Sequence, residues 1–326
     1  MRGSNALRIL CWNVDGAWTE SFIQGRHVYL LPKEPDSGQF GLGRAGRPWP
    51  RHVVDVPAEA LRDTEIDVVV LQRPEELALA ERWLGRRPGR DVAAVYVEHG
   101  TPPGRAATSR HPLADRDDIP VVHTSDFNRL MWDCGRAPTT VVDHGAADPG
   151  PRFTGELPHA LAVVDEPVGR GRDAGADVLE ALRAAAPIDL FGSGAEAVRT
   201  WPDGRGHALT GNPPIPLEEL HTAMARRRVY VHPSRWTSPG APLIEAMLLG
   251  LPVVAVASTA AATLPPSIGA VSCDLGVLAA RLAQLAADRD LAAEAGAAAR
   301  EYALAHHGLE GFLNRWDVLL ERAIAT

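Results

Sequence analysis

The chain has 326 residues, of which 45% are hydrophobic and 23% are charged, a composition typical of a globular protein with two buried cores. Lys and Arg number 33 against 41 Asp and Glu, and the net charge of -8 argues against a protein that binds nucleic acid non-specifically. Three cysteines lie far apart and suit neither a disulfide framework nor a paired metal site: Cys11, Cys134 and Cys273.

The N-terminal region predicts a strand, a helix and a long loop. Residues 7–12 form a short apolar run that ends in the turn-forming residues 13–16, as expected of a buried strand followed by a loop. A helix is expected over residues 19–31. The Gly- and Pro-rich residues 32–50 show little periodicity and predict a long surface loop.

The next segment carries the pattern of a βαβ unit. Residues 67–71 and 93–97 are continuous apolar runs, typical of parallel strands covered on both faces, and residues 75–84 between them have helical spacing. Short apolar runs follow at residues 120–123 and 140–142, each before a polar or Gly-containing loop. The first half therefore predicts an open parallel α/β domain.

A second α/β series follows a segment rich in Pro and Gly at residues 148–158, which has the composition of an interdomain linker. From Leu275 to Ala323 the chain is rich in Ala and Leu with helical periodicity, broken near residues 306–308. Between the linker and this tail, predicted strands at residues 160–164, 188–191, 229–231 and 253–257 alternate with predicted helices at residues 176–185, 217–225 and 242–249.

These elements group into two like-built domains and a tail. We expect an N-terminal Rossmann-like domain over residues 1–152, a C-terminal Rossmann-like domain over residues 153–303, and a final helix over residues 304–326. Two parallel-sheet domains of this kind imply a ligand-binding cleft between them.

Residues 233–258 have the punctuation of a helix that begins at a loop of small residues. Ser238 and Gly240 are candidate caps, and Pro242 suits the first turn because its missing N–H would have no partner there. Such a loop offers backbone N–H groups and the positive end of a helix dipole to a phosphate. Glu245, one turn further on, either accepts hydrogen bonds from a ribose diol or only complements the helix dipole.

This segment resembles the donor-binding signature of retaining GT-B glycosyltransferases of the GT4-like type. In that family two glutamates separated by seven residues flank the loop, and Glu245 matches the second, which binds the ribose of the nucleotide. Thr237 stands in place of the first, so the carboxylate that approaches the donor sugar is missing. Three stretches carry the resemblance: Pro233-Ser234, Glu245-Ala246-Met247 and Gly250-Leu251-Pro252-Val253-Val254.

The resemblance implies an α/β fold of the GT-B type, in which two Rossmann-like domains face a central cleft. The C-terminal domain would bind the nucleotide-sugar donor and the N-terminal domain the acceptor. The last helix would cross back to the N-terminal domain.

Further donor contacts are implied by the same resemblance. Where the family keeps an Arg and a Lys for the diphosphate, this chain offers Arg170 and Arg172, whose fixed cations suit phosphate, although a solvated basic loop explains them equally well. The remaining donor-binding candidates come from a GxG loop, a turn similar to the base-binding turn, and the signature segment: Gly192, Ser193, Asn212, Ser234, Ser238, Gly240, Ala241, Leu243 and Glu245.

In the first half, Gly16 follows the first strand, where the family has a glycine-containing loop beside the phosphates. His99 ends a predicted strand and is similar to a histidine that hydrogen-bonds the donor sugar, so His99 and Thr237 are the candidate catalytic residues. The alternative for His99 is a loop histidine that caps backbone groups. Glu98 is the candidate for orienting the acceptor.

The predicted function is transfer of a hexosyl- or heptosyl-type unit from a nucleoside diphosphate sugar to an acceptor hydroxyl, with retention. One alternative is a nucleotide-sugar epimerase or sugar-phosphate synthase on the same fold. A second alternative is a nucleotide-sugar-binding protein with a degenerate site, because of Thr237. A dehydrogenase is disfavoured, since Asp15-Gly16-Ala17 rather than GxGxxG follows the first strand.

Besides the donor and a small-molecule or glycan acceptor, no cofactor, metal or nucleic-acid partner is expected. The 12 histidines include neither an HxH nor an HExxH pattern. No apolar run reaches the roughly 18 residues of a membrane span, and no signal-peptide pattern precedes the first strand, which predicts a cytoplasmic protein. Weak association with a membrane surface stays open, and the sequence makes no prediction about oligomeric state.

Overall fold

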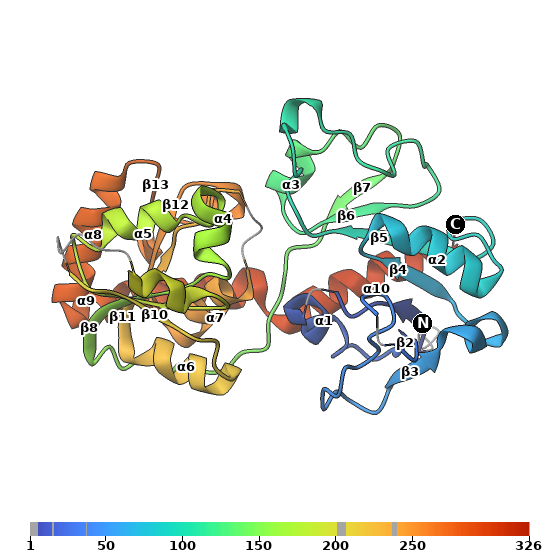
Figure 1. Ribbon diagram of the computed structural model, residues 1–326, viewed down its shortest axis with the longest axis horizontal. Coiled ribbons are helices and arrows are strands. Elements are labelled where there is room, and N and C mark those ends of the chain that lie inside the picture. The colour runs from blue at the N-terminus through green and yellow to red at the C-terminus, as the bar shows by residue number, and fades with distance from the viewer. Residues whose placement is uncertain (1–5, 15, 37, 201–206, 237–239, 326) are drawn as a thin grey trace. The chain divides into compact units, whose positions relative to one another are not determined.

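The computed structural model describes residues 6–14, 16–36, 38–200, 207–236 and 240–325, and the chain forms two compact units (Figure 1). The first unit comprises Met1–Gly145 and Leu309–Thr326, and the second comprises Ala146–Gly308. These divisions differ from the expected boundaries after residues 152 and 303, the second of which lies inside a continuous helix, α9 (Arg289–His307). Each unit contains one parallel sheet, so the expected pair of parallel α/β domains is confirmed.

The first unit has a seven-stranded parallel sheet in the order β3-β2-β1-β4-β5-β6-β7. Its strands are β1 (Arg8–Cys11), β2 (Val28–Lys33), β3 (Val53–Pro57), β4 (Val68–Leu71), β5 (Ala93–Glu98), β6 (Val121–His123) and β7 (Thr139–Val141). Its helices are α1 (Gly16–Phe22), α2 (Pro74–Leu84), α3 (Asp126–Met131) and α10 (Leu309–Ala325), with 3-10 turns at Ala58–Asp63 and Ala106–Thr108.

The single helix predicted over residues 19–31 is wrong. α1 ends at Phe22, and β2 then pairs in parallel with β1, with Arg8 opposite Val28 and Leu10 opposite Leu30. A short apolar run fits a buried strand as well as a helix, and here pairing with β1 and β3 decides between them. The structure also adds β3, for which the sequence predicted no element.

The last helix of the chain is part of the first unit. α10 packs against β4 and β5 and buries Phe312, Trp316 and Leu320 (Figure 1). Trp316 meets two aromatic rings of α1 edge to face, with centroid distances of 5.5 Å to Trp18 and 5.0 Å to Phe22. This aromatic cluster joins the first helix of the unit to the last one.

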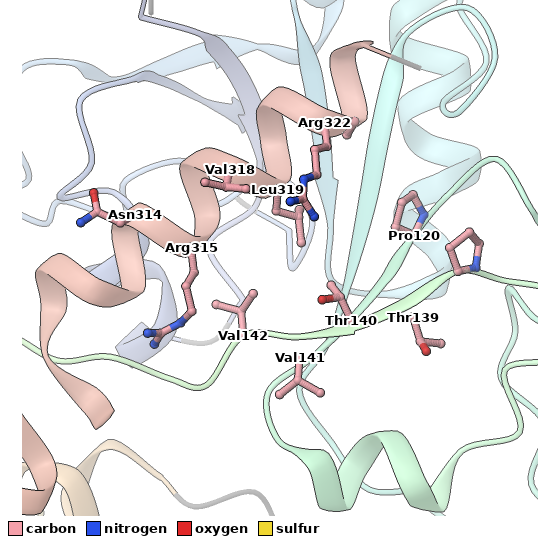
Figure 2. Close-up of a pocket in the computed structure, with 12 residues that line it drawn as sticks. Pro120, Thr139, Thr140, Val141, Val142, Asn314, Arg315, Val318, Leu319 and Arg322 are labelled. Carbon is pink, nitrogen blue, oxygen red and sulfur yellow. The ribbon is translucent and has the colours of Figure 1, made fainter. Parts of the chain in front are cut away.

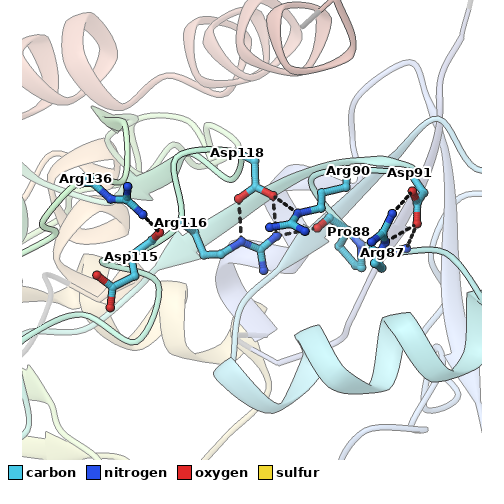
Figure 3. A network of polar contacts seen from close by, with 8 residues as sticks. All are labelled: Arg87, Pro88, Arg90, Asp91, Asp115, Arg116, Asp118 and Arg136. Carbon is cyan, nitrogen blue, oxygen red and sulfur yellow. Dashed lines mark hydrogen bonds and ion pairs between the residues drawn. The ribbon is translucent and has the colours of Figure 1, made fainter.

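A network of ion pairs ties together the loops that precede β5, β6 and β7 (Figure 3). Arg116 contacts the two carboxylate oxygens of Asp118 at 2.6 and 2.8 Å and also donates to the carbonyl of Pro88. The hydrogen bonds from Arg116 hold the pKa of Asp118 below its usual range. These loops lie at the amino ends of the strands, opposite the edge where open α/β sheets bind ligands, so the network is structural.

The second unit has a six-stranded parallel sheet in the order β10-β9-β8-β11-β12-β13. Its strands are β8 (Leu157–Val163), β9 (Ile188–Phe191), β10 (Leu209–Asn212), β11 (Arg227–His232), β12 (Val253–Val256) and β13 (Gly269–Ser272). Its helices are α4 (Pro167–Ala174), α5 (Ala176–Leu182), α6 (Leu217–Arg226), α7 (Ala241–Leu249), α8 (Leu275–Ala287) and α9, with 3-10 turns at Ala195–Thr200, Thr259–Thr263 and Pro266–Ile268.

Two local predictions for the second unit are corrected by the structure. The basic stretch after β8 is not a loop but the short helix α4, which kinks at Gly171 (φ 49°, ψ -117°). Asn212 lies at the end of strand β10 rather than in a turn. Gly211 allows β10 to pack closely, because a Cβ at this position would lie 1.9 Å from the carbonyl oxygen of Ala195.

The predicted helical tail consists of α8, α9 and α10. Asp274 caps α8 by accepting from the backbone N–H of Gly276, and Asp288 caps α9 by accepting from Asp290 and Leu291. The break predicted near residues 306–308 is confirmed at Gly308, which ends α9. Of the helices in the described residues, none is long and apolar enough to cross a membrane.

Candidate functional site

The sheet of the second unit reverses its strand order between β8 and β11. β9 and β10 extend the sheet on the β8 side, and β12 and β13 extend it on the β11 side. The connections that leave the carboxyl ends of β8 and β11 therefore run in opposite directions and open a crevice, which is where open α/β sheets bind ligands. We therefore expect a ligand site in the segments that follow β8 and β11.

The loop after β9 approaches the end of β8 closely at this edge. Gly192 has φ 134°, and a Cβ there would lie 2.3 Å from the carbonyl oxygen of Val164. Asp165 Oδ1 accepts hydrogen bonds from the backbone N–H of Ser193 at 2.8 Å and from its hydroxyl at 3.0 Å. Because a carboxylate of the chain itself occupies the Ser193 N–H, Gly192 and Ser193 shape the loop after β8 in this structure.

The two predicted arginines of α4 have different surroundings. Arg170 is exposed, and its backbone N–H continues α4 by donating to Glu166. Arg172 Nη1 lies 2.9 Å from Asp177 Oδ2, so its cation is paired within the unit. Arg170 is therefore the better placed of the two to meet an anionic ligand.

Arg235 is a residue of this edge that the sequence analysis did not single out. It lies three residues after the end of β11 and makes two contacts with the carboxylate of Asp177, at 2.6 and 2.9 Å. Its hydrogen bonds hold the pKa of Asp177 below its usual range. Arg235 also donates to the carbonyl of Arg172, so it fastens the end of α4 to the loop after β11. The available signal in the sequence was a cation in the loop that follows this predicted strand.

Helix α7 begins at the carboxyl edge at Gly240, which has no side chain to cap it. Gly240 is the N-cap residue and is exposed, whereas Ala241 and Leu243 of the first turn are buried. The positive end of the helix dipole is therefore directed at this edge with no capping side chain at Gly240. Two predicted site residues of the preceding loop, Thr237 and Ser238, lie outside the described residues.

Glu245 lies one turn into α7 and is 13% exposed at its side chain. Its Oε2 is 3.4 Å from Nε2 of His221 on α6, a pairing distance without the alignment of a hydrogen bond. Burial and the Glu245 charge both raise the pKa of Tyr230, with burial the larger effect. Because its contact to His221 is long, Glu245 retains acceptor capacity for a ligand hydroxyl. His221 is a neighbour of Glu245 that the sequence did not indicate.

Two further predicted donor residues lie at or just after the carboxyl ends of strands of this sheet. Asn212 Nδ2 donates to the carbonyls of Leu190 and Thr210, at 3.2 and 3.0 Å, which joins the ends of β9 and β10. Ser234 is buried next to Arg235 at the end of β11.

The sheet of the first unit reverses between β1 and β4, and its carboxyl edge carries a second group of predicted residues. α1 begins at Gly16 after β1, and a Cβ on Gly16 would lie 3.1 Å from Nη2 of Arg47. His99 follows β5, and its ring meets Trp18 of α1 edge to face with centroids 5.3 Å apart. The structure therefore brings Gly16 and His99 to the same edge and adds Arg47 from the long loop.

A chain of hydrogen bonds fixes the ring of His99. Gln72 Nε2 donates to the backbone carbonyl of Trp12 at 2.7 Å, and Gln72 Oε1 lies 2.9 Å from His99 Nε2. Since a carbonyl only accepts, the amide nitrogen must face Trp12 and the amide oxygen must face His99. His99 Nε2 therefore carries a proton, and Nδ1 is the nitrogen that accepts a hydrogen bond when the ring is neutral.

Glu98 and Glu76 accept backbone hydrogen bonds from residues at this edge. Glu98 accepts from the backbone of Gly100 at 2.9 Å and lies 3.2 Å from Nε2 of His111, so its carboxylate is engaged within the unit. Glu76 is fully buried and accepts from the backbone N–H of Gln72 at 2.6 Å. Burial raises the pKa of Glu76 to about 7, with the hydrogen bonds and charge of its neighbours opposing this shift.

Within the described ranges, no cluster of three or more His, Cys, Asp or Glu side chains has a metal-binding arrangement. The residues described above form two candidate binding groups. In the second unit the group is the N-terminus of α7 with Glu245, His221 and Arg170, and in the first unit it is Gly16, Gln72 and His99.

Comparisons with known proteins identify part of this architecture. Residues 172–317 match the family model described as glycosyl transferase-like. No curated protein matches the chain by sequence. The structure of sucrose-phosphate synthase from Thermosynechococcus elongatus is similar, with a TM-score of 0.69 and 17% identity over 98% of this chain and 100% of that chain.

Two more solved structures are similar. HepE from Anabaena, in complex with UDP-glucose, has a TM-score of 0.70 and 16% identity over 97% of this chain and 100% of its own. A TarM mutant from S. aureus, in complex with fondaparinux, alpha-GlcNAc-glycerol and UDP, has a TM-score of 0.60 and 16% identity over 78% of this chain. The match covers 55% of TarM, so this chain spans about half the length of that protein. At these identities the likeness establishes the fold, and the expected GT-B fold is confirmed.

Proposed function

We propose that the protein transfers a glycosyl unit from a nucleoside diphosphate sugar to an acceptor hydroxyl, with retention. The chain has the GT-B fold, and its residues 172–317 match the glycosyl transferase-like family model. The observation that supports this proposal best is the N-terminus of α7 at Gly240 with Glu245 one turn behind it, inside the matched domain.

The diphosphate of the donor is proposed to bind at the N-terminus of α7. A helix N-terminus offers backbone N–H groups and a partial positive charge, and Arg170 on α4 supplies a full cation at the same edge of the sheet. A leaving diphosphate gains negative charge as the glycosidic bond breaks, so fixed dipoles and a cation at this place stabilise the transition state more than the ground state.

Glu245 is proposed to accept hydrogen bonds from the ribose of the donor nucleotide. Its carboxylate is mostly buried and has a long contact to His221, which leaves acceptor capacity where a diol would lie beside the diphosphate. Hydrogen bonds to a charged group contribute about 1.5–3 kcal/mol each, which is enough to govern nucleotide affinity.

His99 is proposed to act from the first unit through its Nδ1 atom. With Nε2 held by Gln72, Nδ1 is the atom that hydrogen-bonds a sugar hydroxyl. Glu98 is proposed to orient the acceptor, although its contacts to Gly100 and His111 make this an indirect role.

The first experiment is calorimetric titration of the protein with UDP, GDP, ADP and TDP, followed by hydrolysis and transfer assays with sugars of the nucleotide that binds. UDP is the first choice because the HepE and TarM structures were solved with UDP or UDP-glucose. A transferase releases the nucleoside diphosphate faster when an acceptor is present. An epimerase consumes donor without acceptor dependence, a degenerate binder releases nothing, and absence of binding to all four nucleotides would contradict the proposal.

A matched pair of variants tests the α7 site. Glu245→Gln is expected to weaken nucleotide binding by about tenfold, because it removes a charged acceptor and retains the side-chain shape. Glu294→Gln makes the same change at an exposed position of α9 and should leave the affinity for nucleotide unchanged. Equal affinity of the folded Glu245→Gln variant and the wild type would reject the ribose contact.

A further inference from the structure

A groove in the first unit lies outside the group of residues proposed to bind donor and acceptor. It encloses about 610 Å³ between α10 and the edge strand β7, and none of the residues predicted from the sequence lines it (Figure 2). Pockets for small molecules have volumes of about 300–1,000 Å³ and predominantly apolar walls with a few placed polar groups. The groove is therefore large enough for a ligand of its own.

One wall of the groove is a second face of α10. Phe312, Trp316 and Leu320 face the core, whereas Val318 and Leu319 line the groove. Val318 is 48% exposed and so presents its apolar side chain to the groove. The apolar surface of α10 thus continues from its core-facing side to the groove, because the partly buried Leu319 also packs against the core cluster that contains Phe312, Trp316 and Leu320.

The opposite wall is the uncovered end of the sheet. Pro120 and Pro138 precede β6 and β7, and Thr140 and Val142 continue this wall toward the carboxyl end of β7 (Figure 2). β7 is the last strand of the sheet and pairs only with β6 among the described strands, so no further one covers it. This wall is apolar or neutral along its whole length.

The charged residues among those described as lining the groove are Arg315 and Arg322, both cationic. They are seven residues apart on α10, about 10.5 Å along the helix axis, with Val318 and Leu319 between them. Arg315 donates to the carbonyl of Asp143 at 3.4 Å, which holds its side chain near the end of β7. An apolar groove with a cation held near the end of β7 is complementary to a molecule that has a hydrocarbon chain and an anionic head.

We propose that this groove binds a single-chain anionic amphiphile, with its phosphate or carboxylate head at Arg315 and its hydrocarbon chain running along Val318 and Leu319. A peptide strand added to β7 is disfavoured, because β7 spans only Thr139–Val141 and the preceding Pro138 has no backbone N–H to donate. The anionic head is preferred over a neutral one because both charged wall residues are arginines, whose planar guanidinium groups form strong charge-assisted hydrogen bonds with phosphate and carboxylate.

The test is calorimetric titration of the full chain with dodecyl phosphate below its critical micelle concentration. We expect one molecule to bind per chain, dodecyl glucoside to bind at least tenfold more weakly, and inorganic phosphate not to compete. Val318→Asp places a carboxylate in the groove at a half-exposed position and should lower the affinity at least tenfold. Arg315→Ala should lower it several-fold, and by more than Arg322→Ala does.

Two control variants carry the same chemical changes at residues that do not line the groove. Val54→Asp alters an exposed valine of β3, at the other edge of the same sheet, and Arg129→Ala removes a cation from α3. Both should bind dodecyl phosphate like the wild type. Equal affinity for dodecyl phosphate and dodecyl glucoside, unchanged binding by Val318→Asp, or binding only to anionic phosphatidylglycerol vesicles and not to the monomer would each overturn the proposal. None of these measurements depends on glycosyl transfer.

Discussion

At the scale of single residues, the buried polar groups of the first unit determine which atoms are presented at its carboxyl edge. Gln72 is the central residue, because its amide joins the carbonyl of Trp12 to the ring of His99 and its backbone N–H is held by Glu76. A histidine at a strand end was visible in the sequence, but the nitrogen that it presents depends on a residue 27 positions earlier.

Replacing Gln72 should change which ring nitrogen of His99 carries the proton. In Gln72→Met the ring loses its Nε2 partner, so we expect the wild-type Nε2–H form to give way to a mixture of both neutral tautomers. Long-range nitrogen-proton correlation spectra of the histidine rings measure this directly. His27 is an internal control, since its Nδ1 accepts from the backbone of Leu7 and its Nε2 faces Asp317. A wild-type His99 in the Nδ1–H form would contradict the assignment.

Glu76 should make the stability of the first unit depend on pH. Its pKa is raised to about 7 by burial, above the value of about 4.3 expected in the unfolded chain. Between these values the folded state holds more protons, so the free energy of unfolding should fall as pH rises from about 4.3 to about 7, by about 4 kcal/mol in total. Denaturant unfolding at a series of pH values measures this slope, and Glu76→Gln should flatten it. An unchanged slope in that variant would assign the pH dependence to other groups.

At the scale of elements, the carboxyl edge of the second sheet depends on close approaches between loops. Gly175 separates α4 from α5 with φ 80°, and a Cβ there would lie 2.1 Å from the carbonyl oxygen of Pro233. This approach, together with the ion pair from Arg235 to Asp177, sets the position of α4 relative to the loop after β11. The sequence showed a glycine, and the packing shows which neighbour requires it.

The substitution Gly175→Ala should destabilise the second unit by more than backbone strain alone. Gly150 has a similar φ of 83°, but a Cβ there would have no neighbouring atom of the described residues within 4 Å. Gly150→Ala therefore reports the backbone strain by itself, about 1–2 kcal/mol. Gly175→Ala adds a steric clash with Pro233 and should cost at least about 1 kcal/mol more. Denaturant unfolding followed by circular dichroism compares the two variants, and equal losses would show that the clash is relieved by a small backbone shift.

At the scale of the whole molecule, two parallel sheets each have their own hydrophobic cores, and the last helix of the chain completes the first unit. Because α10 is separated in sequence from the rest of its unit by the entire second unit, the first unit is complete only when the chain has been synthesised to its last helix. Because each unit has its own hydrophobic cores, we expect a core substitution to destabilise only the unit that contains it.

Trp316→Ala should destabilise the first unit selectively. The side chain is 1% exposed and packs on Trp18 and Phe22, so its truncation should cost about 3–5 kcal/mol. Hydrogen exchange should accelerate in peptides from β4 and β5 and stay unchanged in peptides from β11 and β12. The control Val318→Ala, at an exposed position of the same helix, should cost less than about 1 kcal/mol. Equal acceleration in both units would show that they unfold as one.

The sequence by itself determined the fold class, most strands and helices, and the segment around Glu245, because buried parallel strands and capped helices leave local patterns in residue type and spacing. It misassigned residues 19–31 and missed β3, β10 and β13, since a short apolar run or an edge strand is decided by its pairing partner. Only the tertiary structure paired Arg172 and Arg235 with Asp177, joined Gln72 to His99, and placed α10 beside β7 to form the groove. These are contacts between residues distant in the chain, and their geometry follows from packing that no local pattern encodes.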